Sequence, residues 1–118
     1  MTLLLLLQTL ACGGAYRQGL GAFDEGRYPD AVGEFRRSEA DFPNWSESKR
    51  IRYALYRGLS HLAVGDARET DRWLGYAKSA FDRHPDAFTN EERGRLLAAW
   101  RTIGRMPGEP ASGAQQDQ

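Results

Sequence analysis

The chain has 118 residues, of which 41% are hydrophobic, and its 16 basic residues balance its 16 acidic residues to give no net charge. This length fits one domain with a single core, and the lack of excess Lys and Arg argues against a nucleic-acid partner. One cysteine and two histidines exclude an intramolecular disulfide and a cysteine-based metal cage. We therefore expect no metal and no other cofactor.

The chain begins with an apolar segment in which Leu3–Leu7 is purely aliphatic. The segment is too short to cross a membrane, which takes about 20 apolar residues, and is typical of a secretory signal peptide. Its end, Leu-Ala-Cys at Cys12 followed by two glycines, resembles the lipobox of bacterial lipoproteins. The resemblance implies a signal peptide over residues 1–11 and lipidation of Cys12. It also implies a lipid-anchored position in the cell envelope, at the outer membrane and facing the periplasm. The alternative is that Leu3–Leu10 forms a first buried helix.

A repeated pattern organises the rest of the chain. The segments Ala15–Gly26 and Ala54–Gly65 both read A-x3-G-L-x5-G and start 39 residues apart, at 15 and 54. Farther on, the pattern that ends at Pro43 matches one that ends at Pro85, 42 residues later. The change in spacing predicts a three-residue insertion at 66–72. Repetition with this period is typical of stacked helix pairs.

In the first unit, helical spacing of apolar residues predicts a helix from Ala15 that ends at Gly26, and a second helix that starts near Pro29 and ends at Pro43. In the second unit, Ile51, Leu55, Leu59 and Leu62 form an apolar stripe at helical spacing. Three helix starts are predicted where a capping residue stands three positions before a Glu: Asn44 with Glu47, Asp66 with Glu69, and Thr89 with Glu92.

The third of these starts opens a fifth helix, which ends at Gly104. Residues 105–118 are polar and rich in Pro and Gly, and we expect them to be disordered. No segment alternates apolar and polar residues as a strand does. The sequence therefore predicts an all-α domain over residues 12–104.

These residues resemble the tetratricopeptide repeat (TPR) family. The positions that carry the resemblance are Gly19, Gly26, Tyr28, Ala31, Phe35 and Pro43 in the first unit, with weaker counterparts in the second. The resemblance implies two TPR-like helical hairpins followed by a C-terminal capping helix, as a fragment of an α-solenoid. It also implies that Gly19 and Gly58 let neighbouring helices approach closely. We expect the large side chains opposite them to be Phe35 and Trp73.

We expect no catalytic activity, because the sequence contains no recognisable nucleophile, base or metal motif. His61, beside the apolar stripe, is expected to be a partly buried packing residue and not a base. The resemblance instead implies a protein–protein interaction module, such as an assembly or scaffold factor, that binds a protein or peptide partner on its concave surface. The residues implied for this groove are Tyr16, Leu20, Phe23, Asp24, Arg52, Leu55, Leu59 and Leu62.

Two alternatives remain open at this point. Two repeats bury little surface, so the domain could self-associate as a homo-oligomer and serve as a structural protein of the envelope. It could also be a cytosolic TPR-like adaptor whose start codon has been misread. The three hypotheses assume the same fold and differ in the binding partner and in the location of the protein in the cell.

Overall fold

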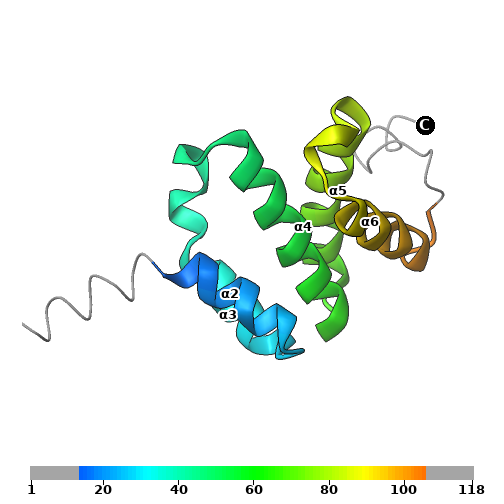
Figure 1. Ribbon diagram of the computed structural model, residues 1–118. Coiled ribbons are helices and arrows are strands. Elements are labelled where there is room, and N and C mark those ends of the chain that lie inside the picture. The colour runs from blue at the N-terminus through cyan, green and yellow to red at the C-terminus, as the bar shows by residue number, and fades with distance from the viewer. Residues whose placement is uncertain (1–13, 106–118) are drawn as a thin grey trace, which may run out of the picture.

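The protein is built from helices. The computed structural model describes residues 14–105, and none of these residues lies in a β-strand. The predicted all-α class is confirmed for this part of the chain. Residues 14–105 form five α-helices and two short 3-10 helices (Figure 1): α2 (Ala15–Asp24), α3 (Tyr28–Arg37), η1 (Glu39–Asn44), α4 (Glu47–Val64), α5 (Ala67–Arg83), η2 (Pro85–Ala87) and α6 (Asn90–Thr102).

The helices pack as two pairs followed by α6. The most extensive contacts are those of α4 with α5 and of α2 with α3, and α3 also packs on α4 and so joins the pairs. α6 contacts both α4 and α5. The core between these elements contains fully buried aromatic and aliphatic side chains, among them Phe35, Tyr53, Leu74 and Trp100.

Two glycines let the helices of each pair approach closely. A Cβ atom on Gly19 would lie 2.6 Å from the Phe35 ring. A Cβ atom on Gly58 would lie 2.6 Å from Leu74 Cδ2 and 2.9 Å from the Leu74 backbone nitrogen. Close-packed interiors leave no room for such overlaps, so a larger residue would force the helices apart. The predicted contact of Gly19 with Phe35 is confirmed, but the prediction of Trp73 opposite Gly58 is wrong because Leu74 occupies that position.

The turns that end α2, α4 and α6 repeat with a constant spacing. Gly26, Gly65 and Gly104 have φ of 77°, 83° and 84°, and each lies 39 residues after the one before it. The residue after each glycine donates its backbone N–H to the carbonyl five residues earlier, at 2.8, 3.0 and 3.1 Å. This hydrogen bond, with a left-handed residue inside it, is the Schellman motif. α6 therefore ends as the first helix of each pair does.

The 39-residue spacing also holds for the second helix of each pair. The predicted position of the insertion, at 66–72, is therefore wrong. Phe35 and Leu74, which face the two glycines, also lie 39 residues apart. The extra residues of the second unit therefore lie after Leu74 and not at 66–72. The units diverge there because α3 has 10 residues and ends at Arg37, whereas α5 has 17. The first unit continues as η1, so the predicted helix does not run to Pro43.

Side-chain caps fix the starts of three helices. The predicted cap at Asn44 is wrong, because Asn44 ends η1 and Ser46 caps α4 by accepting a hydrogen bond from a backbone N–H three residues on. The other two predicted starts are confirmed. Asp66 caps α5, and Thr89 caps α6 in a full capping box with Glu92. Each such cap contributes about 1 kcal/mol to helix stability.

A buried polar network joins the two pairs. Arg57 is 1% exposed, and its guanidinium donates to Glu39 Oε1 at 2.5 Å, to the Tyr53 hydroxyl at 2.8 Å and to His61 Nε2 at 3.2 Å. The Tyr53 hydroxyl donates to the Phe35 carbonyl oxygen at 2.6 Å. His61 must be neutral to accept at Nε2, and its burial, followed by the nearby Arg57 charge, lowers its pKa. His61 is 0% exposed and is thus buried more deeply than the partly buried packing residue that the sequence predicts.

Most of the predictions for the two ends of the chain concern residues that the structure does not describe. The predicted signal peptide (1–11) and the predicted lipidation site Cys12 lie outside the described residues, as does the predicted tail from residue 106 onwards. Arg105, which was predicted to belong to a tail over residues 105–118, forms an ion pair with Asp71 at 2.7 Å. Within residues 14–105, no helix combines the length and hydropathy that a membrane span requires.

Candidate functional site

Helices α2, α4 and α6 border one hollow of the molecule. α4 contacts both α2 and α6 and lies between them in Figure 1. The hollow has a volume of about 450 Å³. Four of the eight predicted groove residues line it, namely Phe23 and Asp24 from α2 and Leu59 and Leu62 from α4. The end of α2 and the second half of α4 are therefore neighbours across one space.

The opposite wall comes from α6, which contributes none of the predicted groove residues. Arg95, Ala98 and Thr102 line the hollow from α6. The predicted groove omitted this helix because the resemblance to repeats stopped before it. The 39-residue spacing could have found it, since Ala98 lies 39 residues after Leu59, as Leu59 lies 39 residues after Leu20.

The hollow carries one cation and one carboxylate. The Arg95 guanidinium carbon lies 5.2 Å from the centre of the Phe23 ring and 5.6 Å from that of Tyr56, and one of its nitrogens is 2.6 Å from the Glu91 carboxylate. Cations over aromatic faces are stabilised by the ring quadrupole. Asp24 is exposed and makes no ion pair or hydrogen bond with its side chain among residues 14–105. The arginine therefore has fixed neighbours, and the aspartate has none.

The other predicted groove residues do not line this hollow. Tyr16 is half-buried, and its ring centre lies 5.5 Å from that of Trp45. Leu20 is also half-buried and packs against the core. Leu55 is fully buried, and its assignment to a partner surface is therefore wrong. Its position on α4 turns it into the core shared with the neighbouring helices, out of reach of a docking protein.

Arg52, the last predicted groove residue, ties α6 to α4. Its Nε and Nη2 lie 2.8 and 3.0 Å from the two carboxylate oxygens of Glu92, whose side chain is 7% exposed. Burial alone would raise the pKa of Glu92, but hydrogen bonds from Arg52 and from the Thr89 backbone N–H hold the pKa below its ordinary value. Such a bidentate, charge-assisted ion pair is stronger than a hydrogen bond between neutral groups. Arg52 thus serves first to fix the far wall of the hollow.

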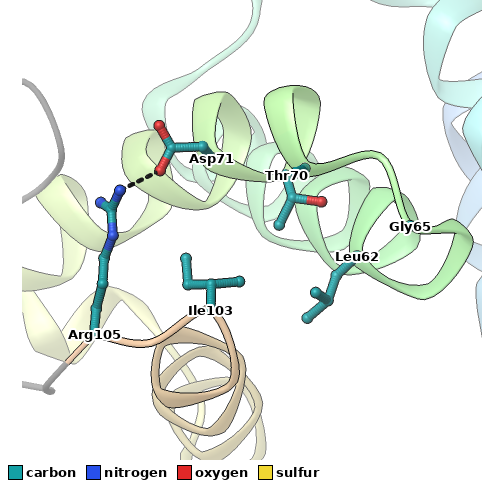
Figure 2. Close-up of a pocket in the computed structure, with 7 residues that line it drawn as sticks. Leu62, Gly65, Thr70, Asp71, Ile103 and Arg105 are labelled. Atoms are coloured by element: carbon teal, nitrogen blue, oxygen red, sulfur yellow. Dashed lines mark ion pairs between the residues drawn. The ribbon is translucent and has the colours of Figure 1, made fainter.

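A second hollow, of about 370 Å³, lies where the end of α4, the start of α5 and the end of α6 meet. Figure 2 shows Asp71 and Arg105 paired on one side of it, Leu62 on the opposite side and Ile103 between them. Leu62 lines both hollows. The carboxyl-terminal end of α4 therefore borders both hollows.

The linings of the two hollows combine apolar side chains with a few charged and hydroxyl groups. Neither lining contains a His or Cys residue. Within residues 14–105, no three His, Cys, Asp or Glu side chains are grouped so that they could hold a metal ion. Apolar walls with a few charged groups at the edge are the common composition of binding sites.

Comparison of the chain with protein-family models, with curated proteins and with solved structures gives no significant match.

Proposed function

We propose that the protein is a non-enzymatic module that binds a segment of another protein in the hollow between α2, α4 and α6. The observation that carries the proposal is the convergence of half-buried apolar side chains, Phe23, Leu59 and Leu62, on one hollow with charged groups at its edge. Covering apolar surface of this kind gains about 25 cal/mol per Å². The Arg52–Glu92 pair joins the α4 and α6 walls before binding, which lowers the ordering cost of association.

We further propose that the two helix pairs are TPR-like hairpins and that α6 is their capping helix. The constant 39-residue spacing of the turns at Gly26, Gly65 and Gly104 supports this interpretation. So do the close contacts at Gly19 and Gly58, where a small residue on the first helix receives a large side chain from the second. In such an array the first helices of successive units border a common concave surface. The hollow lies between α2, α4 and α6, in keeping with this arrangement.

The proposal includes the location of the protein in the cell. The lipobox-like end of the apolar segment supports a lipid anchor at Cys12 in the bacterial envelope. Labelling of cells with a clickable palmitate tests it, with Cys12→Ser as the matched variant. Label on the wild type that is lost in Cys12→Ser supports the anchor. An unlabelled wild-type protein that fractionates with the cytosol contradicts it.

The binding proposal is tested with a display library of short random peptides selected on the purified full chain. Ala98→Glu introduces a bulky charge at an exposed position inside the hollow. Val64→Glu introduces the same side chain at a 43% exposed position on α4 that lines neither hollow. We expect both variants to fold, and we expect selected peptides to bind Ala98→Glu at least about tenfold more weakly, a loss of about 1.4 kcal/mol.

Two results would contradict the binding proposal. One is a selection that yields no peptide above background. The other is equal binding to the wild type and to Ala98→Glu. Light scattering on the same samples reports whether the chain is a monomer, and a concentration-independent oligomer that hides the hollow would favour the structural, self-associating alternative instead.

A further inference from the structure

We infer that the partner segment of this hollow carries a basic side chain, Lys or Arg, next to the apolar side chain that fills it. The inference rests on the proposed function and specifies the chemistry of its partner. The group that points to it is Asp24, the carboxylate at the edge of the hollow. Two features of Asp24, its lack of a counter-charge and its place on α2, set it apart from the other acidic residues.

The first feature is the missing counter-charge. Among residues 14–105, only Asp24 and Asp41 are carboxylates that form no ion pair within 4.0 Å. All the others lie beside an arginine or lysine. Asp41 lies in η1 and does not line the hollow, whereas Asp24 does.

The second feature is the position of Asp24 as the last residue of α2. The carboxyl-terminal end of a helix carries a partial negative charge, so a carboxylate there is unfavourable by about 0.3–1 kcal/mol and a cation is favourable by a similar amount. The last turns of α3, α5 and α6 each contain an arginine, whereas the last turn of α2 contains no basic residue. The end of α2 therefore lacks the basic side chain that stands in the last turn of these three helices.

The neighbours of Asp24 favour a long basic side chain from a partner. Phe23 and Tyr28 also line the hollow, and their rings meet edge to face with centres 5.6 Å apart. The methylene stem of a lysine or arginine can lie along such apolar surface while its charged end reaches a carboxylate. Arg95, the cation on the opposite wall, has its own carboxylate neighbour in Glu91 at 2.6 Å. It therefore leaves the charge of Asp24 available to a ligand.

The test uses the same random-peptide library on the full chain and three variants. Asp24→Asn removes the charge at the hollow, Asp24→Lys reverses it, and Asp41→Asn removes the other unpaired carboxylate as a matched control. We expect the wild type and Asp41→Asn to select peptides in which Lys or Arg stands next to a large apolar residue. Asp24→Asn should keep the apolar preference and lose the basic one, and Asp24→Lys should select Asp or Glu at the same place.

The best wild-type peptide should bind Asp24→Asn about two- to fivefold more weakly, as an exposed ion pair predicts, with a smaller dependence on salt. Two results would overturn the inference and leave the docking proposal intact. These are selected peptides with apolar residues but no excess of basic ones, and equal losses of affinity in Asp24→Asn and Asp41→Asn. Failure of the docking proposal is recognised separately, because peptides would then bind Ala98→Glu as tightly as the wild type or would not be selected at all.

Discussion

Replacing Gly58 by alanine should destabilise the protein, although alanine is the better helix former. The added Cβ atom would lie 2.6 and 2.7 Å from the Leu74 side chain and 2.9 Å from its backbone nitrogen. The side chain is fully buried and cannot turn into water. The backbone nitrogen belongs to α5 and moves only if the whole helix moves. The substitution should therefore push α5 away from α4 along the most extensive helix contact of the molecule.

Two opposing terms set the size of this effect. Alanine gains about 1 kcal/mol over glycine in helix propensity. Overpacking of a well-filled core costs about 1–3 kcal/mol, and a clash with backbone belongs at the upper end of that range. We therefore expect the free energy of unfolding of Gly58→Ala to fall by about 1–2 kcal/mol. Gly19→Ala should cost less, because all three of its closest atoms belong to the Phe35 side chain.

Urea unfolding followed by circular dichroism measures these differences. Gly94→Ala on α6 is the matched control, since a Cβ atom there meets nothing within 4 Å in the described structure apart from the adjoining backbone of its own helix. Gly94→Ala should raise the free energy of unfolding by up to about 1 kcal/mol. The double variant Gly58→Ala with Leu74→Ala should be less destabilised than the sum of the two single changes, because the second removes the clashing atoms. Equal stabilisation by Gly58→Ala and Gly94→Ala would refute the close contact of α4 with α5.

Three further predictions concern buried polar groups. Glu92→Gln leaves Arg52 without its counter-charge and should lower the free energy of unfolding by about 1–3 kcal/mol at neutral pH. Because the pKa of Glu92 is lowered from 4.5, the difference should shrink as the wild-type carboxylate is protonated at pH values below 4.5. Tyr53→Phe removes the hydroxyl that joins Arg57 to α3 and should cost about 1–3 kcal/mol, with no change in peptide binding. Burial and Arg57 lower the pKa of His61 from 6.5 in the folded protein. As the pH decreases through 6.5, His61 is therefore protonated in the unfolded chain before it is protonated in the folded protein, and the free energy of unfolding should fall. His61→Gln keeps an acceptor for Arg57 and should flatten that dependence; an unchanged slope of unfolding free energy against pH would contradict the assignment.

Local signals in the sequence were enough to predict the helical class and the position of most helix ends. The caps at Asp66 and Thr89 and the glycines that follow α2, α4 and α6 act through their own backbone neighbourhoods. The contact of Gly19 with Phe35 was also predictable, because a repeat of small and large residues at helical spacing constrains which faces meet.

Tertiary packing decided what the sequence left ambiguous. Trp73 and Leu74 are adjacent in sequence but point in directions about 100° apart around α5, and the larger side chain was the wrong choice opposite Gly58. Leu55 and Leu59 belong to one stripe of α4, yet the first is fully buried and the second is half-buried at the hollow. The exposure of each leucine depends on how far α2 and α6 cover α4 at that point along its axis. A local sequence pattern does not contain this tertiary information.

The most direct test of the central claim is to follow the backbone amide NMR shifts of the full chain as a selected peptide is added. Docking in the hollow between α2, α4 and α6 predicts that the largest shifts occur at Phe23, Leu59 and Ala98, one residue from each wall. Shifts centred instead on Phe42 and Tyr76, which line a separate apolar surface depression of about 290 Å³, would contradict the claim.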